Sequence, residues 1–380
     1  MKNPPISIFN NIKPLAPDTQ GVKYIGSKQK LLQDILLITH GLDVKSVFDG
    51  FSGSTRVSQA FAKNGAHVTS ADNSEWSYVF GLCYLMNKKE VKAYQELIDH
   101  LNALKGYDGW FTENYGGRDF SGSSVQSDGL KKPWQIHNTR KLDAIRDEID
   151  RLHLTEIEKA VALTSLIQAL DKVDNTLGHQ TSYLRDWSPR SYNEMVLMVP
   201  NVFENLQDHV VLKGDIFETI KNVNVDLAYF DPPYGSNNEK MPSSRVRYKA
   251  YYHLYTTIIK NDKPKLSGVA GRREDSSDKL TPSAFEEYRK DAAGNFIGVK
   301  AIDKLIESVN ARYVALSYSS GGRASIAELY EMSNRHGKLI KTIEVDYKKN
   351  VMANMKWTNE WLRDADEQHK EFIFLIDKQA

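Results

Sequence analysis

Several features that define whole classes of protein are scarce in this chain of 380 residues. Its single cysteine, Cys83, excludes an internal disulfide framework and fits a reducing compartment, so we expect a cytoplasmic protein. There is no run of 18 apolar residues, and residues 1–17 are polar and interrupted by prolines, which predicts neither a membrane span nor a signal peptide. Cysteines and histidines do not occur at metal-ligand spacing, and we expect no metal site.

An excess of charge of one sign is lacking too. The chain has 50 Lys and Arg against 49 Asp and Glu, a net charge of +1, and 41% of its residues are hydrophobic. No internal repeat or low-complexity tract is evident. This composition predicts a globular enzyme with one large domain and a second, smaller one.

The most informative motif follows an apolar run, residues 225–230, which is typical of a buried parallel strand. Directly after it come Asp231, Pro232, Pro233 and Tyr234. A polar turn after a strand is one interpretation of this tetrapeptide. The other is a catalytic site for methylation of an exocyclic amine.

The chemistry of such an amine explains the motif. The amino nitrogen of adenine shares its lone pair with the ring and is a poor nucleophile. The Asp231 carboxylate and a backbone carbonyl, both accepting from the amine, would free that lone pair. Two prolines fix φ and supply no competing N–H, and the Tyr234 ring offers a face for a planar base. Because an acceptor works best ionised, we expect no raised pKa for Asp231.

A second motif lies upstream, where a short strand at residues 46–49 precedes a loop at 50–55 and a helix near 56–63. Glycines between a strand and a helix let the backbone approach a ligand closely. A further strand ends in Asp72, which follows Gly53 by 19 positions, near the spacing that places a carboxylate on ribose hydroxyls. A dinucleotide site is the alternative, but the G-x-G-x-x-G fingerprint is absent. The looser loop suits S-adenosylmethionine, which has a ribose and no phosphate.

Together these motifs resemble the Dam-like (α-group) DNA adenine-N6 methyltransferases. The resemblance rests on Tyr-Ile-Gly-Ser-Lys at residues 24–28, Phe-Ser-Gly at 51–53 and Asp-Pro-Pro-Tyr at 231–234, in that order and with a long insertion before the last. Weaker matches are Lys-Gly-Asp at 213–215 and Leu-Ser-Tyr-Ser at 316–319. The loop departs from the family in having Gly-Ser-Thr where Gly-x-Gly is usual.

The resemblance implies a role for each matching residue. The cofactor-binding residues would be Tyr24, Lys28, Asp49, Phe51, Gly53, Ser54, Asp72, Asp215 and Asp231. Among them, Tyr24 and Lys28 would close over the methionine end of the cofactor, and Asp215 would hold its adenine amine. The catalytic residues would be Asp231, Pro232, Pro233 and Tyr234. A purely structural role is the alternative for three of these residues. Lys28 could be a solvated residue in the first turn of a helix, and Asp72 and Asp215 could be ordinary turn acids.

The charge is uneven along the chain. Residues 236–273 contain nine Lys or Arg against two acids, with four interleaved tyrosines at 248, 251, 252 and 255. Basic residues neutralise phosphates and aromatic rings stack on bases, so we interpret 236–280 as a DNA-contacting loop. A solvated loop whose tyrosines pack on the domain edge is the alternative. The expected DNA-binding residues are Arg245, Arg247, Lys249, Arg272, Arg273, Arg118 and Arg140.

Three regions are expected. Residues 1–105 form the cofactor half of a methyltransferase domain, 106–200 an inserted target-recognition region, and 201–380 the catalytic half. In the insertion, residues 106–135 predict irregular structure, and 138–174 predict helix with a capping box at Thr155. Asn138, Arg185 and Arg190 are further base-reading candidates by chemistry alone.

The remaining pattern alternates between helix and strand. It predicts helices near 27–38, 74–104, 298–309 and 323–335, and strands near 209–213, 311–318, 338–346 and 371–376. The fold class is therefore α/β, a Rossmann-like class I methyltransferase fold with a mostly parallel, doubly wound sheet and helices on both faces.

The expected function is S-adenosylmethionine-dependent methylation of adenine N6 in double-stranded DNA, by a monomer that is an orphan enzyme or partners a restriction endonuclease. Methylation of cytosine N4 uses the same chemistry, but that group usually begins its tetrapeptide with Ser, and protein glutamine methylation usually with Asn. The sequence also leaves open RNA adenine methylation and a non-catalytic DNA-binding protein with a decayed cofactor fold.

Overall fold

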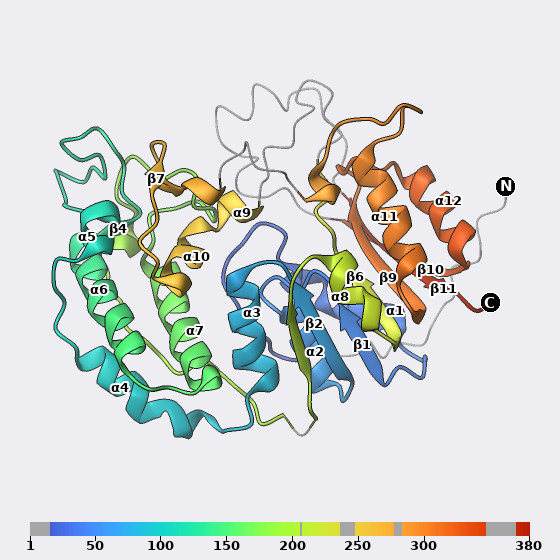
Figure 1. Cartoon of the computed structure of the whole chain (residues 1–380), viewed down its shortest axis with the longest axis horizontal. Helices are drawn as coiled ribbons and strands as arrows, with labels where there is room; N and C mark the ends of the chain where they lie inside the picture. The colour runs from blue at the N-terminus through green and yellow to red at the C-terminus, as the bar shows by residue number, and fades with distance from the viewer. Residues whose placement is uncertain (1–15, 206, 236–247, 277–282, 347–369) are drawn as a thin grey trace.

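A seven-stranded sheet forms the centre of the protein, in the order β10-β11-β9-β6-β1-β2-β5 (Figure 1). The computed structural model describes residues 16–205, 207–235, 248–276, 283–346 and 370–380. The strands are β1 (Ser46–Asp49), β2 (His67–Asp72), β5 (Val210–Lys213), β6 (Val225–Phe230), β9 (Ala311–Ser319), β10 (Lys338–Asp346) and β11 (Lys370–Asp377). Neighbours from β5 to β9 pair in parallel, whereas β11 is antiparallel to β9 and β10. The mostly parallel sheet confirms the predicted α/β class.

Helices cover both faces of this sheet. They are α1 (Leu32–Thr39), α2 (Arg56–Lys63), α3 (Glu75–Gly81), α8 (Ile216–Thr219), α11 (Ile297–Ser308) and α12 (Ile326–His336). Side chains alternate along a strand, so neighbouring residues face opposite layers. Val47 and Leu227 pack with α1 and α2, whereas Phe48 and Ala228 pack with α8, α11 and α12. This alternation makes the sheet doubly wound, as predicted.

The chain order places a topological switch point between β1 and β6. From β1 the sheet grows through β2 to β5 on one side, and β6 then pairs with β1 on its other side. Ligands of open α/β sheets bind outside the carboxyl ends of the strands at such a point. The loop after β1 and the Asp-Pro-Pro-Tyr motif after β6 therefore meet at one edge.

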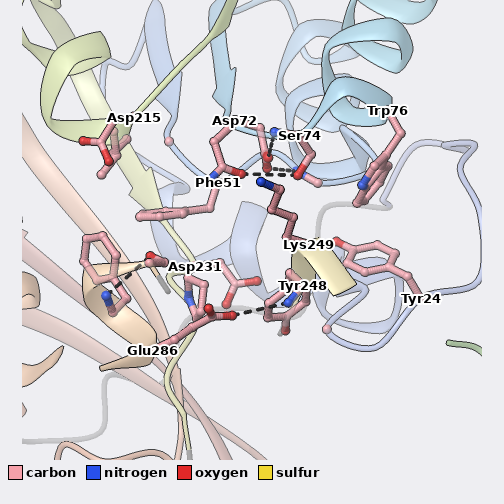
Figure 2. Close-up of a pocket in the computed structure, with 18 of the residues that line it drawn as sticks. Tyr24, Phe51, Asp72, Ser74, Trp76, Asp215, Asp231, Tyr248, Lys249 and Glu286 are labelled. Carbon is pink, nitrogen blue, oxygen red and sulfur yellow. Dashed lines mark hydrogen bonds between the residues drawn. The ribbon is translucent and has the colours of Figure 1, made fainter. Parts of the chain in front are cut away.

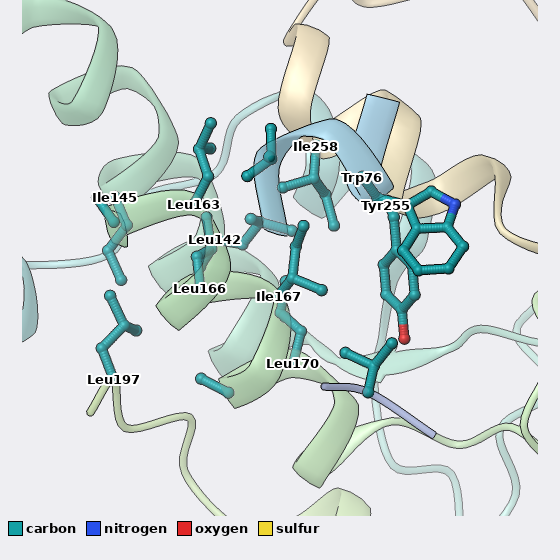
Figure 3. Close-up of a cluster of buried hydrophobic side chains, with 14 of the residues drawn as sticks. Trp76, Leu142, Ile145, Leu163, Leu166, Ile167, Leu170, Leu197, Tyr255 and Ile258 are labelled. Atoms are coloured by element: carbon teal, nitrogen blue, oxygen red, sulfur yellow. The ribbon is translucent and has the colours of Figure 1, made fainter. Parts of the chain in front are cut away.

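A helical region lies beside the sheet, to its left in Figure 1. Its elements are α4 (Gln95–Ala103), α5 (Trp110–Tyr115), α6 (Ile136–Arg151), α7 (Glu156–Val173), the short strands β3 (Gly116–Gly117) and β4 (Trp134–Gln135), and a 3-10 turn (Pro189–Tyr192). The predicted capping box at Thr155 and Glu158 starts α7. The apolar stripes of α6 and α7 face one another in Figure 3, with Trp76 of α3 and Ile258 beside them. One buried cluster thus joins the helical region to the sheet domain.

Residues 248–276, which we call the post-motif segment, form a folded extension of this cluster. The segment comprises α9 (Tyr248–Tyr251), α10 (His253–Lys260), β7 (Leu266–Ser267), β8 (Arg272–Arg273) and a 3-10 turn (Glu274–Ser276). The Arg146 Nε donates to the carbonyl of Ile258 at 2.6 Å, and the Tyr115 hydroxyl donates to that of Gly271 at 2.8 Å. The segment therefore packs on α5 and α6 and is not a solvated loop.

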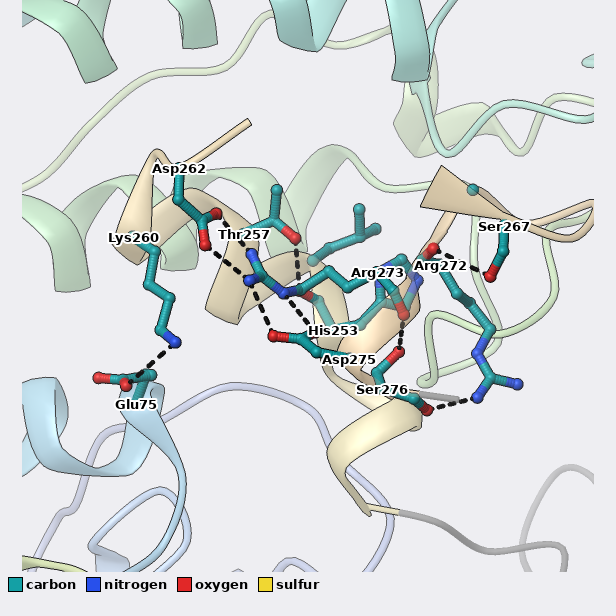
Figure 4. Close-up of polar contacts among 12 residues, drawn as sticks. Glu75, His253, Thr257, Lys260, Asp262, Ser267, Arg272, Arg273, Asp275 and Ser276 are labelled. Atoms are coloured by element: carbon teal, nitrogen blue, oxygen red, sulfur yellow. Dashed lines mark hydrogen bonds and ion pairs between the residues drawn. The ribbon is translucent and has the colours of Figure 1, made fainter. Parts of the chain in front are cut away.

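This packing corrects part of the predicted DNA-contacting loop. Tyr252 and Tyr255 are 1% and 4% exposed, so their rings belong to the core. Arg273 is 3% exposed and donates to both oxygens of Asp262, at 2.6 and 2.7 Å, and also to Asp275 (Figure 4). A buried, doubly paired guanidinium holds the hairpin to α10 and cannot reach a phosphate. Arg245 and Arg247 lie outside the described residues.

Most predicted elements agree with the structure to within a few residues. The helix predicted near 74–104 is wrong as one element, because a π-helical turn (Leu82–Met86), an extended Asn87 and a 3-10 turn (Val91–Tyr94) separate α3 from α4. The Asn87 side chain bonds the amide and the carbonyl of Lys89, which stabilises the break. The helix predicted from 323 starts at Ile326, because Ser325 and Glu328 form a capping box.

Two further 3-10 turns are Ile220–Asn222 and Ala284–Glu286, and one at Lys28–Leu31 precedes α1. In the part of the chain that is described, no helix is long and apolar enough to cross a membrane.

Candidate active site at the carboxyl ends of β1, β2 and β6

A pocket opens where the carboxyl ends of β1, β2 and β6 meet (Figure 2). It contains about 1230 Å³ of empty space, part of it open to solvent. Its walls include Tyr24, Phe51, Gly53, Asp72, Ser74, Trp76, Asp215, Asp231, Pro233, Tyr248, Lys249, Phe285 and Glu286. The structure therefore brings residues from seven separate stretches of the chain to one cavity.

The loop after β1 follows the pocket floor closely. At Gly53, φ is +50°, and a Cβ there would lie 2.6 Å from the Tyr24 hydroxyl oxygen, so the position requires glycine. The Asp72 carboxylate accepts from the Gly53 amide at 3.0 Å and from the Ser74 amide at 2.9 Å. Asp72 thus fixes the loop against the start of α3 while lining the pocket. The interpretation as an ordinary turn acid accounts for the bond to Ser74 but not for the bond to Gly53, which lies 19 positions away.

Asp215 follows β5, the strand next to β2, and lies beside Phe51 in Figure 2. It is exposed, and one of its carboxylate oxygens caps α8 by accepting from the Phe217 amide at 2.9 Å. Asp215 is therefore both a helix cap and part of the pocket. The two interpretations that the sequence left open are compatible.

The Asp231 carboxylate lies at the base of the pocket in an ion pair with a buried lysine. Lys28 is 6% exposed, and its Nζ lies 2.9 Å from Asp231 Oδ1, 2.8 Å from Glu371 Oε1 and 3.0 Å from the Tyr234 hydroxyl. The ammonium thus donates hydrogen bonds to Glu371 and Tyr234 and forms an ion pair with Asp231. The resemblance implies that Lys28 closes over the methionine end of the cofactor; in the structure its ammonium contacts the Asp-Pro-Pro-Tyr motif, and Lys28 is not among the residues that line the pocket.

The electrostatics of this cluster differ from expectation. The pKa of Asp231 is raised to about 7, chiefly by burial; the Lys28 ammonium lowers it and the negative charge of Glu371 adds to the rise. Burial alone would lower the pKa of Lys28, but Asp231, Tyr234 and Glu371 hold it well above its usual value. Lys28 is thus charged at neutral pH. The raised pKa of Asp231 differs from the expectation, because burial disfavours the charged carboxylate and Glu371 competes for the same ammonium.

Three other predicted residues support the pocket from outside its walls. Asp49 is 1% exposed and accepts from the Ser58 hydroxyl at 2.6 Å, and burial raises the pKa of Asp49 to about 7. Ser54 is 1% exposed behind the loop. The Tyr234 ring packs against Tyr318, with centroids 4.9 Å apart.

The sequence motifs did not identify several of the residues that line the pocket. Trp76 lies one helical turn beyond Asp72, so its position after a ligand-binding strand could have identified it. Lys249, which we expect to contact DNA, also lines the pocket. Glu286 and Phe285 come from a 3-10 turn that no pattern marks. Glu371, which contacts Lys28 behind the pocket, comes from the last strand.

The remaining DNA-binding candidates separate into structural and exposed side chains. Asn138 and Arg190 bond backbone groups within the helical region, at Asn193, Met195, Asp174 and Thr176. The Nη2 of Arg140 donates to Asp108 at 3.0 Å, and the Nη2 of Arg272 donates to the Ser276 carbonyl at 2.7 Å. Arg118 and Arg185 are exposed.

These two exposed arginines belong to neighbouring irregular segments. The Ser124 amide donates to the Arg185 carbonyl at 2.8 Å, and the Gln126 side chain bonds the Arg118 backbone. Over the described ranges, no cluster of three or more His, Cys, Asp or Glu side chains could hold a metal ion.

Comparison with known proteins agrees with this geometry. The chain is 27% identical over 338 residues to the type II methyltransferase M.NlaIII of Neisseria lactamica, which covers 86% of this chain and 92% of that protein. It is 28% identical over 323 residues to the modification methylase StsI of Streptococcus sanguinis, and 27% identical over 374 residues to the type II methyltransferase M.FokI of Planomicrobium okeanokoites. These matches cover 81% and 94% of this chain but 45% and 53% of those relatives, so the chain spans about half of their length.

A family model gives the broadest match. Residues 24–332 match the D12 class N6 adenine-specific DNA methyltransferases, a range that begins at Tyr24 and contains both the loop after β1 and the Asp-Pro-Pro-Tyr motif. Because this match covers most of its length, the chain belongs to the D12 class N6 adenine-specific DNA methyltransferase family.

Proposed function

We propose that this chain methylates N6 of adenine in double-stranded DNA, with S-adenosylmethionine as the methyl donor. The observation that carries the proposal is the position of Asp231, which follows β6 directly and faces the same pocket as Asp72 and Asp215. A donor bound along those two acids would lie beside the carboxylate that receives the target amine. Membership of an adenine-specific family supports the same reaction and the same base.

The chemistry of the pocket walls fits the parts of this cofactor. Asp72 offers a carboxylate to ribose hydroxyls, Phe51 offers a ring face to the adenine, and Asp215 an acceptor for its amine. Tyr24 lies by the loop, where the methionine end would bind. The bound cofactor supplies an activated methyl group on its sulfonium, so the protein has to contribute mainly orientation and electrostatics.

The catalytic motif would receive an adenine that has left the DNA stack. Asp231 and the Pro232 carbonyl accept from the target amine, and the Tyr234 ring stacks on the base. Unstacking and unpairing cost a few kcal/mol, which contacts between the protein and DNA must offset. Lys28 keeps the carboxylate oriented, since the ammonium lies 2.9 Å from Asp231 Oδ1.

We assign sequence recognition to residues 106–200, the part of the helical region after α4, whose exposed arginines lie outside the pocket. The relatives named above are modification methylases and type II methyltransferases, which favours a restriction-modification context with a partner endonuclease. A cytoplasmic monomer is sufficient for this activity.

A methyl-transfer assay on unmethylated genomic DNA, followed by single-molecule sequencing for modified bases, tests the proposal. N6-methyladenine in one fixed context would support both the reaction and sequence recognition. N6-methyladenine without a fixed sequence context would support the reaction but not sequence recognition. The helical region would then serve only to bind DNA. No methylated base, with the cofactor bound, would refute DNA as the substrate and direct the search to RNA or protein.

Activity is expected to fall at acid pH because the target amine needs an ionised Asp231. Burial and Glu371 raise the pKa of this carboxyl to about 7, so the ionised fraction is high above pH 7 and decreases roughly tenfold per pH unit well below it. The measurement is kcat/KM for DNA from pH 5.5 to 8.5 at constant ionic strength. A rate that stays flat down to pH 5.5 would mean that Asp231 titrates at its ordinary value.

The double substitution Arg118→Ala/Arg185→Ala is expected to weaken DNA binding and to flatten its salt dependence. If each arginine neutralises one phosphate, the slope of log K against log salt should decrease by about 2. Fluorescence anisotropy from low to moderate salt measures this slope. Arg312→Ala/Lys338→Ala removes two charges at the amino ends of β9 and β10, the opposite edge from the pocket, and serves as the matched control. An equal slope in both variants would remove this face from the DNA interface.

A further inference from the structure

The buried cluster around Lys28 contains a second carboxylate to which no motif assigns a role. Glu371, at the start of β11, is 4% exposed, and its Oε1 accepts from Lys28 Nζ at 2.8 Å and from the Ser317 hydroxyl at 3.0 Å. The Tyr234 hydroxyl lies 3.5 Å from the same oxygen. A carboxylate this deeply buried is costly unless it is paired, so its position calls for an explanation.

We propose that Glu371 is a positioning residue for methyl transfer, which holds Lys28 against Asp231 and so fixes the carboxylate that receives the target amine. The inference rests on the proposed function of the Asp231 pocket. Glu371 does not line the pocket, whereas Asp231 does. Glu371 therefore acts on the target amine only through Lys28 and Asp231.

The geometry supports this chain of contacts. A lysine side chain is flexible, and an ammonium with a single partner can swing between rotamers. Here the ammonium donates to Glu371 and to the Tyr234 hydroxyl and forms an ion pair with Asp231, and three partners fix it at one point. Ser317 in β9 holds the Glu371 carboxylate in turn. The antiparallel strand β11 thus connects the far part of the sheet to the catalytic motif.

Glu371 also affects the charge balance of the motif. Asp231 and Glu371 share one ammonium, so the cluster carries an excess negative charge when both are ionised. The negative charge of Glu371 raises the pKa of Asp231, after burial, and Lys28 lowers it. The titratable groups that face Asp231 are Lys28, Tyr24, Asp49, Tyr229, Tyr234, Tyr248 and Glu371.

Two substitutions separate the contact of Glu371 with Lys28 from the effect of its negative charge. Glu371→Ala removes the anchor, and the single-turnover rate of methyl transfer is expected to fall about 10- to 100-fold, because small misplacements of a reacting group have effects of this size. Affinities for S-adenosylmethionine and DNA should stay close to wild type. Glu371→Gln keeps an acceptor for Lys28 and Ser317, so it should recover most of the rate at pH 8 and move the acid limb of the pH profile to lower pH.

Glu344→Gln is the matched control, since Glu344 lies in neighbouring β10 and pairs with Lys370 away from the pocket. It should leave both the rate and the pH profile unchanged. A residue that only stabilises β11 would instead lower the melting temperature and all affinities together, with the acid limb of Glu371→Gln unmoved. That result would overturn the proposal, and it can be obtained from Glu371→Gln even if Glu371→Ala does not fold.

Carboxyl NMR gives a readout that does not depend on turnover. In protein labelled at the aspartate side chains, the Asp231 resonance is identified by its loss in Asp231→Ala, and its titration should shift to lower pH in Glu371→Gln. An unshifted titration overturns the inference. A shifted titration in a chain that methylates no substrate would leave the coupling intact and refute the proposed function alone.

Discussion

Asp231→Ala is expected to reduce the rate of methyl transfer at least about 100-fold, the usual effect of removing one preorganised hydrogen-bonding partner from a transition state. The substitution removes the acceptor that frees the lone pair of the target amine. It does not remove the Pro232 carbonyl, the pocket walls or the exposed arginines of the helical region. DNA binding should therefore stay within about threefold of wild type.

The fold should tolerate this change. Removing one member of a buried ion pair usually leaves an uncompensated charge that destabilises the protein. Here Lys28 keeps Glu371 at 2.8 Å and the Tyr234 hydroxyl at 3.0 Å, so its ammonium remains paired. Circular dichroism should show an intact protein with a similar melting temperature.

Single-turnover kinetics and anisotropy on the same DNA measure the two quantities. Asp43→Ala, which deletes an exposed acid in the turn before β1, is the control and should match wild type in both. If Asp231→Ala lost affinity for DNA as much as it lost rate, the carboxylate would serve binding and not the chemical step.

The chemical motifs were predictable because they depend on local sequence and on one rule of topology. Parallel strands in one sheet present their carboxyl ends at one edge, so the acids at the ends of β2, β5 and β6 were expected to gather there. Asp72, Asp215 and Asp231 indeed line a single pocket. The same rule predicts that a side chain following a strand, such as Trp76, lies near the ligand.

The position of Glu371 beside Lys28 could not be predicted from the sequence. It lies 343 positions from Lys28 along the chain, and no motif surrounds it. Its contact with Lys28 depends on β11 entering the sheet between β9 and β10, which neither spacing nor periodicity specifies. A buried polar network of this kind is set by tertiary structure and becomes visible only in coordinates.

The post-motif segment shows a second limit. Counting charges in 236–273 identified a basic stretch correctly, but a count cannot reveal which charges are paired. Arg273 is neutralised by Asp262 and Asp275, and the rings of Tyr252 and Tyr255 fill the core. Alternating aromatic and basic residues are equally compatible with a DNA surface and with a helix buried on one face. Tertiary packing decides between them.

Asp72→Ala is expected to lower the affinity for S-adenosylmethionine about 10- to 100-fold, because hydrogen bonds to a charged group contribute roughly 1.5–3 kcal/mol. Two effects act in the same direction. The substitution removes the acceptor proposed for the ribose, and it leaves the amides of Gly53 and Ser74 without the carboxylate that holds them. The loop on which the cofactor would lie is then free to shift.

Calorimetric titration with S-adenosylhomocysteine, which does not react, measures this affinity directly. Asp208→Ala is the control, since Asp208 is a fully exposed acid paired only at the surface with Lys88. Asp72→Asn keeps the shape but replaces one acceptor oxygen by a donor that faces an amide, so it should also bind weakly. If both Asp72 variants bound the ligand within twofold of wild type, the pocket would not be the cofactor site. The role of Asp72 would then be limited to holding the amides of Gly53 and Ser74 in place.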